Sequence, residues 1–275
     1  MNKYRLIGYL KNALIVLLSI LIFLIWIVPI IWLIYGSFLP SDAIARSEFG
    51  FTLTLDNYRE VFERTQVLSF LKNSVIVGFT ATLLSALIGI PAAYSMARWN
   101  TGGSGLAFWI LSSRMMPPAV SIIPFFLLFT KIGIVDTIYG LVIAHLSFGL
   151  AFTIWMSRVF ICEIPVEIEE AARVDGANLW TIISKITLPL ARPGLIATMI
   201  LNLIFSWNEY LFAFSLSLTE KSRTLPIVAG IFVTSYQIKW GPMFAAACII
   251  MIPILFLALL VQRHIIGGLT MGAFK

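Results

Sequence analysis

Six long apolar segments occupy most of this sequence, and their length restricts the folds that the chain can adopt. An α-helix rises about 1.5 Å per residue, so about 20 apolar residues are needed to span the roughly 30 Å of hydrocarbon in a bilayer. The segments that reach this length are residues 13–35, 70–96, 106–130, 138–160, 194–218 and 243–266. The sequence therefore predicts an all-α membrane protein with six transmembrane helices.

The composition indicates the same class. Charged residues make up 12% of the 275 residues and hydrophobic residues 60%, whereas an average soluble domain carries about 25% charged residues. The formal net charge of +6 is typical of a membrane protein that holds its basic residues on the cytoplasmic side, so we expect no nucleic-acid partner. Two cysteines and two histidines give no indication of a disulfide framework or a metal site.

The distribution of basic residues predicts the orientation. The apolar run Ala13–Ile34 is too long for a signal peptide and follows three basic residues, which favours a retained first span with a cytoplasmic N-terminus. With that orientation, ten basic residues lie on the inner side and eight on the outer side. We therefore expect a single transmembrane domain, residues 1–275, in the inner (cytoplasmic) membrane with both termini in the cytoplasm.

The segment between the fourth and fifth spans, residues 161–193, is strongly charged and is expected to face the cytoplasm. Pro165 suits the first turn of a helix, where a missing N–H costs nothing, and Gly176 suits a left-handed C-cap. Asn178 can cap a second short helix that runs from Leu179 to Leu188 and that the following proline ends. The loop is therefore predicted to contain two short helices with a sharp corner between them.

Two adjacent alanines on the first of these helices, Ala171 and Ala172, leave a shallow surface that another protein can approach closely. The alternative is a solvated linker, but linkers rarely carry two capped helices. The defining residues of the segment are Glu170, Ala171, Ala172, Gly176, Ile186, Leu188 and Pro189. Their spacing resembles the EAA motif of the permease subunits of bacterial ATP-binding-cassette (ABC) importers.

In that family the motif forms a coupling helix that fits a cleft on a separate ATPase subunit. The resemblance implies a set of ATPase-coupling residues: Glu170, Ala171, Ala172, Asp175, Gly176, Ile186, Leu188 and Pro189. It also implies that closure of two ATPase subunits moves the spans between inward-open and outward-open forms.

The resemblance extends over nearly the whole chain. Asn73-Ser74, Pro117-Pro118 and Trp207-Asn208-Glu209 are similar to residues of the carbohydrate group of these permeases. The tail, residues 267–275, resembles that of the maltose-type second permease. That similarity implies a further contact with the ATPase through Thr270, Met271 and Gly272.

The family also implies the rest of the assembly. The chain contains no G-x-x-x-x-G-K-[ST] loop, so ATP and Mg²⁺ are expected on a partner ATPase. We therefore expect a transport subunit without a cofactor of its own, and not an enzyme. The expected partners are a homologous second permease, two ATPase subunits, an extracytoplasmic solute-binding protein, membrane lipid, and a sugar, oligosaccharide or polyol as cargo.

Two charged residues, Arg114 and Glu209, fall inside apolar spans. Each costs about 2.5–3.5 kcal/mol at a helix centre, so such residues normally face a partner or a wet cavity. Glu209 lies near Asn202, Trp207 and Asn208 in the sequence, and aromatic, amide and carboxylate groups together suit a polyhydroxylated ligand. Two interpretations stay open: these four residues form a substrate path, or Glu209 only bonds to a neighbouring span.

The third span carries two further features. Arg114 lies near enough to the start of the span to snorkel to the inner surface. The pair Pro117-Pro118 must interrupt the helix. Such a break either lines a cavity at membrane depth or is a packing kink.

An ion- or proton-coupled secondary transporter is the main alternative function. Such a protein needs intramembrane ionisable groups and often shows repeated halves. Glu209 alone gives this alternative little support, and the motif in residues 161–193 would be unexplained. An intramembrane enzyme is a weaker alternative, because the sequence shows no H-E-x-x-H motif and no paired membrane aspartates.

Overall fold

The computed structural model describes residues 3–45, 52–234 and 236–270, with side chains for residues 11–44, 52–234 and 236–259. In these ranges almost all of the chain is helical, and one isolated bridge joins Val233 to Ile238. The elements are α1 (Lys3–Ser37), α2 (Ser41–Ala45), α3 (Asp56–Arg64), α4 (Val67–Trp99), α5 (Gly103–Met115), α6 (Pro118–Lys131), α7 (Ile138–Cys162), α8 (Val166–Val174), α9 (Leu179–Ile182), the π-helical turn η1 (Ile183–Thr187), α10 (Leu188–Trp207), α11 (Leu211–Leu216), α12 (Ile227–Ile231) and α13 (Trp240–Thr270). The all-α prediction is confirmed.

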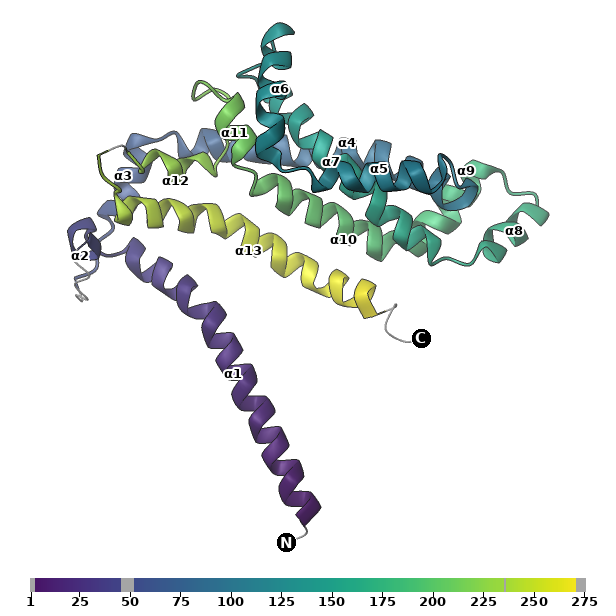
Figure 1. Cartoon of the computed structure of the whole chain (residues 1–275), viewed down its shortest axis with the longest axis horizontal. Coiled ribbons are helices and arrows are strands. Elements are labelled where there is room, and N and C mark those ends of the chain that lie inside the picture. Colours follow the sequence, from purple (N-terminus) through teal and green to yellow (C-terminus); the bar gives the residue numbers. More distant parts are fainter. Residues whose placement is uncertain (1–2, 46–51, 235, 271–275) are drawn as a thin grey trace. The chain divides into compact units, whose positions relative to one another are not determined.

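Five helices of the described chain are long and apolar enough to cross a membrane, and α5 with α6 makes a sixth if the bent pair counts as one span. The third expected span, residues 106–130, therefore consists of two helices and not of one straight helix. Its two halves meet at an angle of 93°, and Figure 1 shows α6 standing away from α5. The interruption falls at Pro117-Pro118, as predicted, because a proline removes a backbone donor and its ring clashes with the preceding turn.

The fifth span differs from its prediction at both ends. It begins in the loop, because α9, η1 and α10 form one uninterrupted apolar helix from Leu179 to Trp207. The prediction that Pro189 ends the second loop helix is wrong. In η1 the Leu188 N–H donates to the carbonyl of Ile183, and Pro189 lies in the first turn of α10, where a missing N–H is tolerated.

At the other end the helix stops at Trp207, and α11 is a separate short helix. The expected span of residues 194–218 is thus too long by its last turns.

The chain divides into two compact units, one formed by residues up to Thr65 with Val228–Ile249, and the other by Gln66–Ile227 with the residues from Ile250 onward.

In the first unit, α3 forms polar contacts with the end of α1 and with the residue that precedes α13. The buried amide of Asn57 donates to the carbonyls of Ser37, at 2.9 Å, and Leu39, at 2.7 Å. Lys239, which immediately precedes α13, places its Nζ 2.6 Å from Glu60 Oε1 on α3. Buried amides are retained where both donor hydrogens find acceptors, as they do here.

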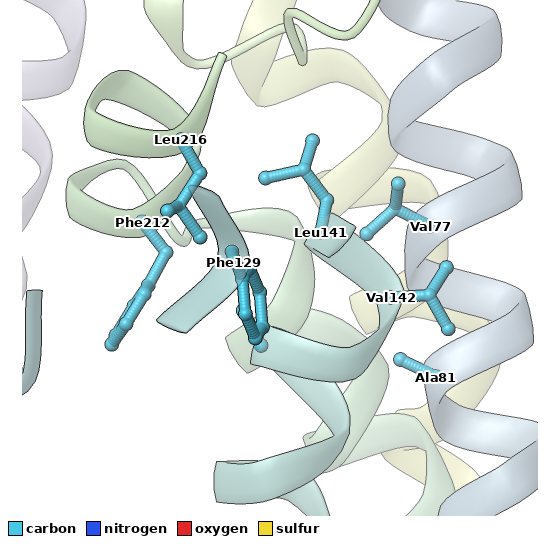
Figure 2. Close-up of a cluster of buried hydrophobic side chains, with 8 residues drawn as sticks. Val77, Ala81, Phe129, Leu141, Val142, Phe212 and Leu216 are labelled. Carbon is cyan, nitrogen blue, oxygen red and sulfur yellow. The ribbon is translucent and has the colours of Figure 1, made fainter. Parts of the chain in front are cut away.

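In the second unit, α4, α7 and α10 pack side by side (Figure 1). A Cβ on Gly89 of α4 would come within 3.0 Å of Thr153 on α7, so the small residue permits a close helix crossing. A cluster of buried apolar side chains joins α4, α6, α7 and α11 (Figure 2). Its members are Val77, Ala81, Phe129, Leu141, Val142, Ala144, Phe212 and Leu216. This cluster fixes the two short helices against the long ones.

Candidate functional site

The corner in the 161–193 loop has the predicted geometry. Pro165 takes the N-cap position of α8, one residue before the first turn. Gly176 has φ +86°, and the Ala177 N–H donates to the Ala172 carbonyl at 2.9 Å, which closes the helix end in the manner of a left-handed cap. Asn178 then caps α9, because its Oδ1 accepts from the Thr181 N–H at 2.8 Å.

The outer surface of this corner is exposed and partly apolar. Glu170, Ala171, Asp175 and Gly176 are all exposed. Val174 and Trp180, which the sequence did not single out, are 88% and 76% exposed. Both side chains therefore add apolar area to the exposed surface of the corner.

The remaining motif residues have a different role. Ile186 and Leu188 are half-buried, and Leu188 packs against a buried cluster that includes Tyr94, Ile161 and Leu195. Pro189 is exposed at the start of α10. The structure therefore brings the residues from Glu170 to Gly176 together on one exposed corner and places Leu188 in the packing that supports it.

Glu169 is the residue of the loop that the sequence missed. It is one of three glutamates in α8 and is 1% exposed. Its Oε1 lies 2.9 Å from Arg98 Nε and 2.7 Å from Thr187 Oγ1, and its Oε2 accepts from Tyr94 Oη at 2.8 Å. Arg98 also donates to the Ile164 carbonyl at 3.1 Å. The only signal in the sequence is a lone basic residue at the end of the second span.

The charge state of Glu169 follows from these contacts. Burial raises the pKa of the carboxyl group, but hydrogen bonds from Thr187, Tyr94 and Arg98 outweigh burial and hold the pKa below its ordinary value. The carboxylate is therefore ionised and paired with the Arg98 guanidinium, whose side chain is 4% exposed. Removing one partner of a buried ion pair typically costs about 3–5 kcal/mol.

A second candidate site is a cavity of about 130 Å³ inside the second unit. The lining residues are Arg114, Met116, Pro118, His145, Phe148, Gly149, Asn202, Phe205, Ser206, Glu209 and Phe212. The break between α5 and α6 contributes Met116 and Pro118, so the interrupted third span lines a cavity.

Arg114 lines this cavity. Its guanidinium carbon lies 4.8 Å from the centroid of the Phe205 ring and 5.6 Å from that of Phe152. A weak hydrogen bond of 3.4 Å reaches the Phe148 carbonyl. Among the side chains that the structure describes, no carboxylate forms an ion pair with it. The cavity thus contains a cation held by aromatic faces.

Glu209 both lines the cavity and organises the backbone. Its carboxylate accepts from the N–H groups of Phe212, at 2.9 Å, and Ala213, at 3.1 Å, and so caps α11. His145 is buried, with Nδ1 2.6 Å from Ser206 Oγ and Nε2 3.6 Å from Glu209 Oε2. Glu209 therefore lines the cavity and also lies close to a histidine of a neighbouring span.

Trp207 and Asn208 do not join this cavity. Trp207 is 3% exposed, and its Nε1 donates to the Ile250 carbonyl at 3.3 Å. Asn208 is exposed, and its side-chain amide donates to the Ile204 carbonyl at 2.9 Å. Of the four expected substrate-path residues, the structure brings together Asn202 and Glu209. It adds Arg114 and His145, which lie distant in the sequence.

Two other expectations concern the tail and metals. Met271 and Gly272 lie outside the described residues, and Thr270 is the last residue of α13. Within the described part of the chain, no group of three or more His, Cys, Asp or Glu residues could hold a metal ion.

Residues 85–270 match the model of a protein family, the binding-protein-dependent transport system inner membrane components. The chain belongs to this family. The permease is 35% identical to the trehalose transport system permease of Mycobacterium tuberculosis, over 90% of this chain and 92% of that one. It is 32% identical to the trehalose/maltose transport system permease of Thermococcus litoralis, over 97% and 98% of the two chains.

Solved structures show the same fold. A chain of a bacterial ABC transporter involved in the import of the acidic polysaccharide alginate superposes with a TM-score of 0.74 at 24% identity, over 96% of this permease and 98% of that chain. A chain of the inward-facing MetNI methionine ABC transporter gives a TM-score of 0.57 at 17% identity, over 74% and 95%. The family resemblance seen in the sequence is confirmed, and the protein is a transport subunit and not an enzyme.

Proposed function

We propose that this permease is a transmembrane subunit of an ABC importer that moves a sugar, oligosaccharide or polyol into the cell by alternating access. The observation that carries the proposal is the exposed corner of α8 and α9, which presents the Glu170–Gly176 motif on a surface free to dock. Relatives that are named as permeases for trehalose, diacetylchitobiose and maltose support a carbohydrate cargo.

The assembly would contain a homologous second permease, two ATPase subunits and an extracytoplasmic solute-binding protein. The family is defined by dependence on a binding protein, and the sequence lacks a phosphate-binding loop, so ATP and Mg²⁺ would bind to the ATPase subunits. The N- and C-termini would lie in the cytoplasm, on the same side as the 161–193 loop. The tail residues Thr270, Met271 and Gly272 would contact the same partner.

Docking on the ATPase would bury the exposed corner. Val174 and Trp180 supply its apolar area, while Ala171 lets a partner approach the α8 backbone. Tryptophan is enriched in the central part of protein interfaces. Closure of the two ATPase subunits would displace α8 and, through the helix that continues from α9 into α10, the membrane-spanning part of the permease.

The cavity would contribute to the cargo path. Arg114 and Asn202 present hydrogen-bond donors, Glu209 and Asn202 present acceptors, and Phe205 presents an aromatic face. A hydroxyl group both donates and accepts, so such a mixed lining suits polyhydroxylated molecules, whose apolar C–H faces also stack on rings.

The decisive experiment is reconstitution of the complete importer in vesicles with its binding protein. Uptake of radiolabelled neutral disaccharides, polyols and acidic oligosaccharides would be compared with ATP present on the ATPase side and with ion gradients alone. We expect uptake of at least one carbohydrate that requires ATP and both permeases. Uptake that continues with the ATPase subunits removed and a gradient imposed would instead favour a secondary transporter.

A further inference from the structure

The short helix α8 buries one of its side chains in the rest of the second unit. Within α8, which the structure describes in full, Glu169 is the one buried residue. The neighbouring side chains Ile168 and Glu170 are exposed. Glu169 is therefore the main side chain within α8 through which a displacement by a partner can be transmitted, in addition to the two ends of the helix.

The contacts of Glu169 reach three residues on two separate elements. Arg98 and Tyr94 belong to the last turns of α4, and Thr187 is the last residue of η1, where the loop enters α10. Charge-assisted hydrogen bonds are short and directional, so three of them on one carboxylate fix the position and also the orientation of α8.

Arg98 strengthens this attachment from a second side. The same guanidinium that pairs with Glu169 also donates to the carbonyl of Ile164, just before α8 begins. One residue of α4 therefore holds both the entry and the middle of α8. Tyr94 is 2% exposed and packs edge-on against Trp99 at 5.6 Å, so the end of α4 is itself well fixed.

We propose that Glu169 is a positioning residue that makes α8 and the cytoplasmic end of α4 move as one body when the ATPase subunits displace α8. The inference rests on the proposed function for the displacement, and it adds a second route into the membrane, through α4, to the continuous route from α9 into α10. The two adjacent glutamates then have separate tasks: Glu170 faces the partner and Glu169 holds the helix to the permease.

The test compares two substitutions with the same chemical change. Glu169→Gln keeps the size of the side chain, but it removes the charge that pairs with Arg98 and puts an NH₂ donor among groups that are themselves donors. Glu170→Gln is the matched control for the exchange measurement, which involves no ATPase, because Glu170 is exposed and the structure records no hydrogen bond of its side chain.

The first measurement is hydrogen exchange of the α8 amides in the purified full chain in lipid nanodiscs, which needs neither ATPase nor cargo. We expect exchange in Glu169→Gln to be about tenfold faster or more than in the parent, as the loss of a charged hydrogen bond predicts, with Glu170→Gln unchanged. Equal exchange in the parent and in Glu169→Gln would contradict the claim that Glu169 attaches α8 to the rest of the permease.

The second measurement is carbohydrate uptake per ATP hydrolysed by the assembled importer. We expect Glu169→Gln to lower this ratio about tenfold while basal ATP hydrolysis by the assembled complex persists. Faster exchange with an unchanged ratio would show a structural attachment only and would overturn the positioning role. A parent complex that imports no carbohydrate would contradict the proposed function. The exchange comparison would still show whether Glu169 holds α8 to the rest of the permease.

A milder substitution covers the case in which Glu169→Gln does not assemble. Tyr94→Phe removes the hydroxyl group that donates to the Glu169 carboxylate and leaves the ion pair between Glu169 and Arg98 intact. It is expected to shift both measurements in the same direction by a smaller factor, and no shift in either would count against the proposal.

Discussion

Gly149 lies directly against Asn202: a Cβ on Gly149 would stand 2.7 Å from Asn202 Oδ1 and 3.0 Å from Ser85 Oγ. The first distance is shorter than real Cβ contacts and the second is at their lower limit. The backbone of α7 is packed between α4 and α10. The absence of a side chain at residue 149 therefore determines where the amide of Asn202 sits in the cavity.

Gly149→Ala is expected to destabilise the permease by about 1–3 kcal/mol, the usual range for overpacking a core, and to displace Asn202 from the cavity. The thermal unfolding midpoint in detergent checks the first effect, and the rate of carbohydrate uptake checks the second.

Gly105→Ala on α5 is the matched control for this substitution. A Cβ there meets nothing within 4 Å, and alanine is favoured over glycine inside a helix by about 0.5–1 kcal/mol. The control should therefore unfold at the same temperature as the parent or slightly above it. A destabilisation of both variants by the same amount would contradict the packing argument.

Arg114→Gln separates cargo handling from stability. Arg114 lines the cavity without an ion-pair partner among the described side chains, so its replacement removes a charged donor and leaves no carboxylate unpaired. Because a hydrogen bond to a charged group contributes about 1.5–3 kcal/mol, we expect uptake to fall about tenfold or more while the unfolding midpoint changes little.

Trp207→Phe should show the opposite pattern. Trp207 is buried and donates to the Ile250 carbonyl, so the loss of this bond should lower stability by about 0.5–1.5 kcal/mol and leave the uptake rate of the assembled importer unchanged. If Trp207→Phe reduces uptake but keeps full stability, Trp207 contributes to the substrate path and this prediction is wrong.

Local chemistry made much of this molecule predictable from the sequence. The length of the apolar segments determines the helices, and the φ of Gly176 and the cap on Asn178 follow from backbone preferences of single residues. The break at Pro117-Pro118 has the same local origin. The continuation of the helix through Pro189 could not be predicted, because the pattern of apolar residues does not indicate the π-helical turn that precedes this proline.

Contacts between distant elements could not be read in this way. Glu169 and Glu170 are adjacent and identical in type, yet one is buried and the other exposed. The difference is made by Arg98, 71 residues earlier in the chain. The cavity likewise depends on Arg114 and His145 meeting Glu209 across three elements, which helical periodicity in one segment does not reveal.

Gly176→Val tests the corner between α8 and α9. A φ of +86° is strongly unfavourable for a β-branched residue, at a cost of about 1–3 kcal/mol, although no neighbouring atom lies within 4 Å of the added Cβ. The substitution should therefore change the direction of α9 relative to α8. We expect it to abolish cargo-stimulated ATP hydrolysis while the permease still inserts in the membrane.

Gly176→Asn is the control for conformation, because asparagine tolerates the left-handed region better than other residues with side chains. It should retain most of the stimulated hydrolysis. If valine and asparagine reduce the stimulation equally, the added bulk rather than the backbone angle is responsible, and the corner would act through surface contact alone.

Asp136 gives a pH-dependent prediction at the other end of the second unit. It has φ +60°, and its carboxylate accepts from Thr219 Oγ1 and Ser222 Oγ, each at 2.6 Å, and from the Thr219 N–H at 3.0 Å. Burial raises the pKa of this carboxyl group, but the hydrogen bonds from Ser222 and Thr219 outweigh it and lower the pKa overall.

A carboxyl group whose folded pKa lies below its unfolded pKa, about 3.9 for aspartate, stabilises the fold fully above that value. This contribution is lost as the pH falls through the folded pKa. Asp136→Asn keeps the shape and the tolerance of positive φ but cannot ionise. We therefore expect the parent to unfold at a higher temperature than Asp136→Asn by a constant margin between about pH 5 and 7, and this margin to shrink below about pH 4. Thermal unfolding in detergent across this pH range measures the margin, and a margin that stays constant or grows at acid pH would show that the ionised carboxylate does not hold the 217–222 segment.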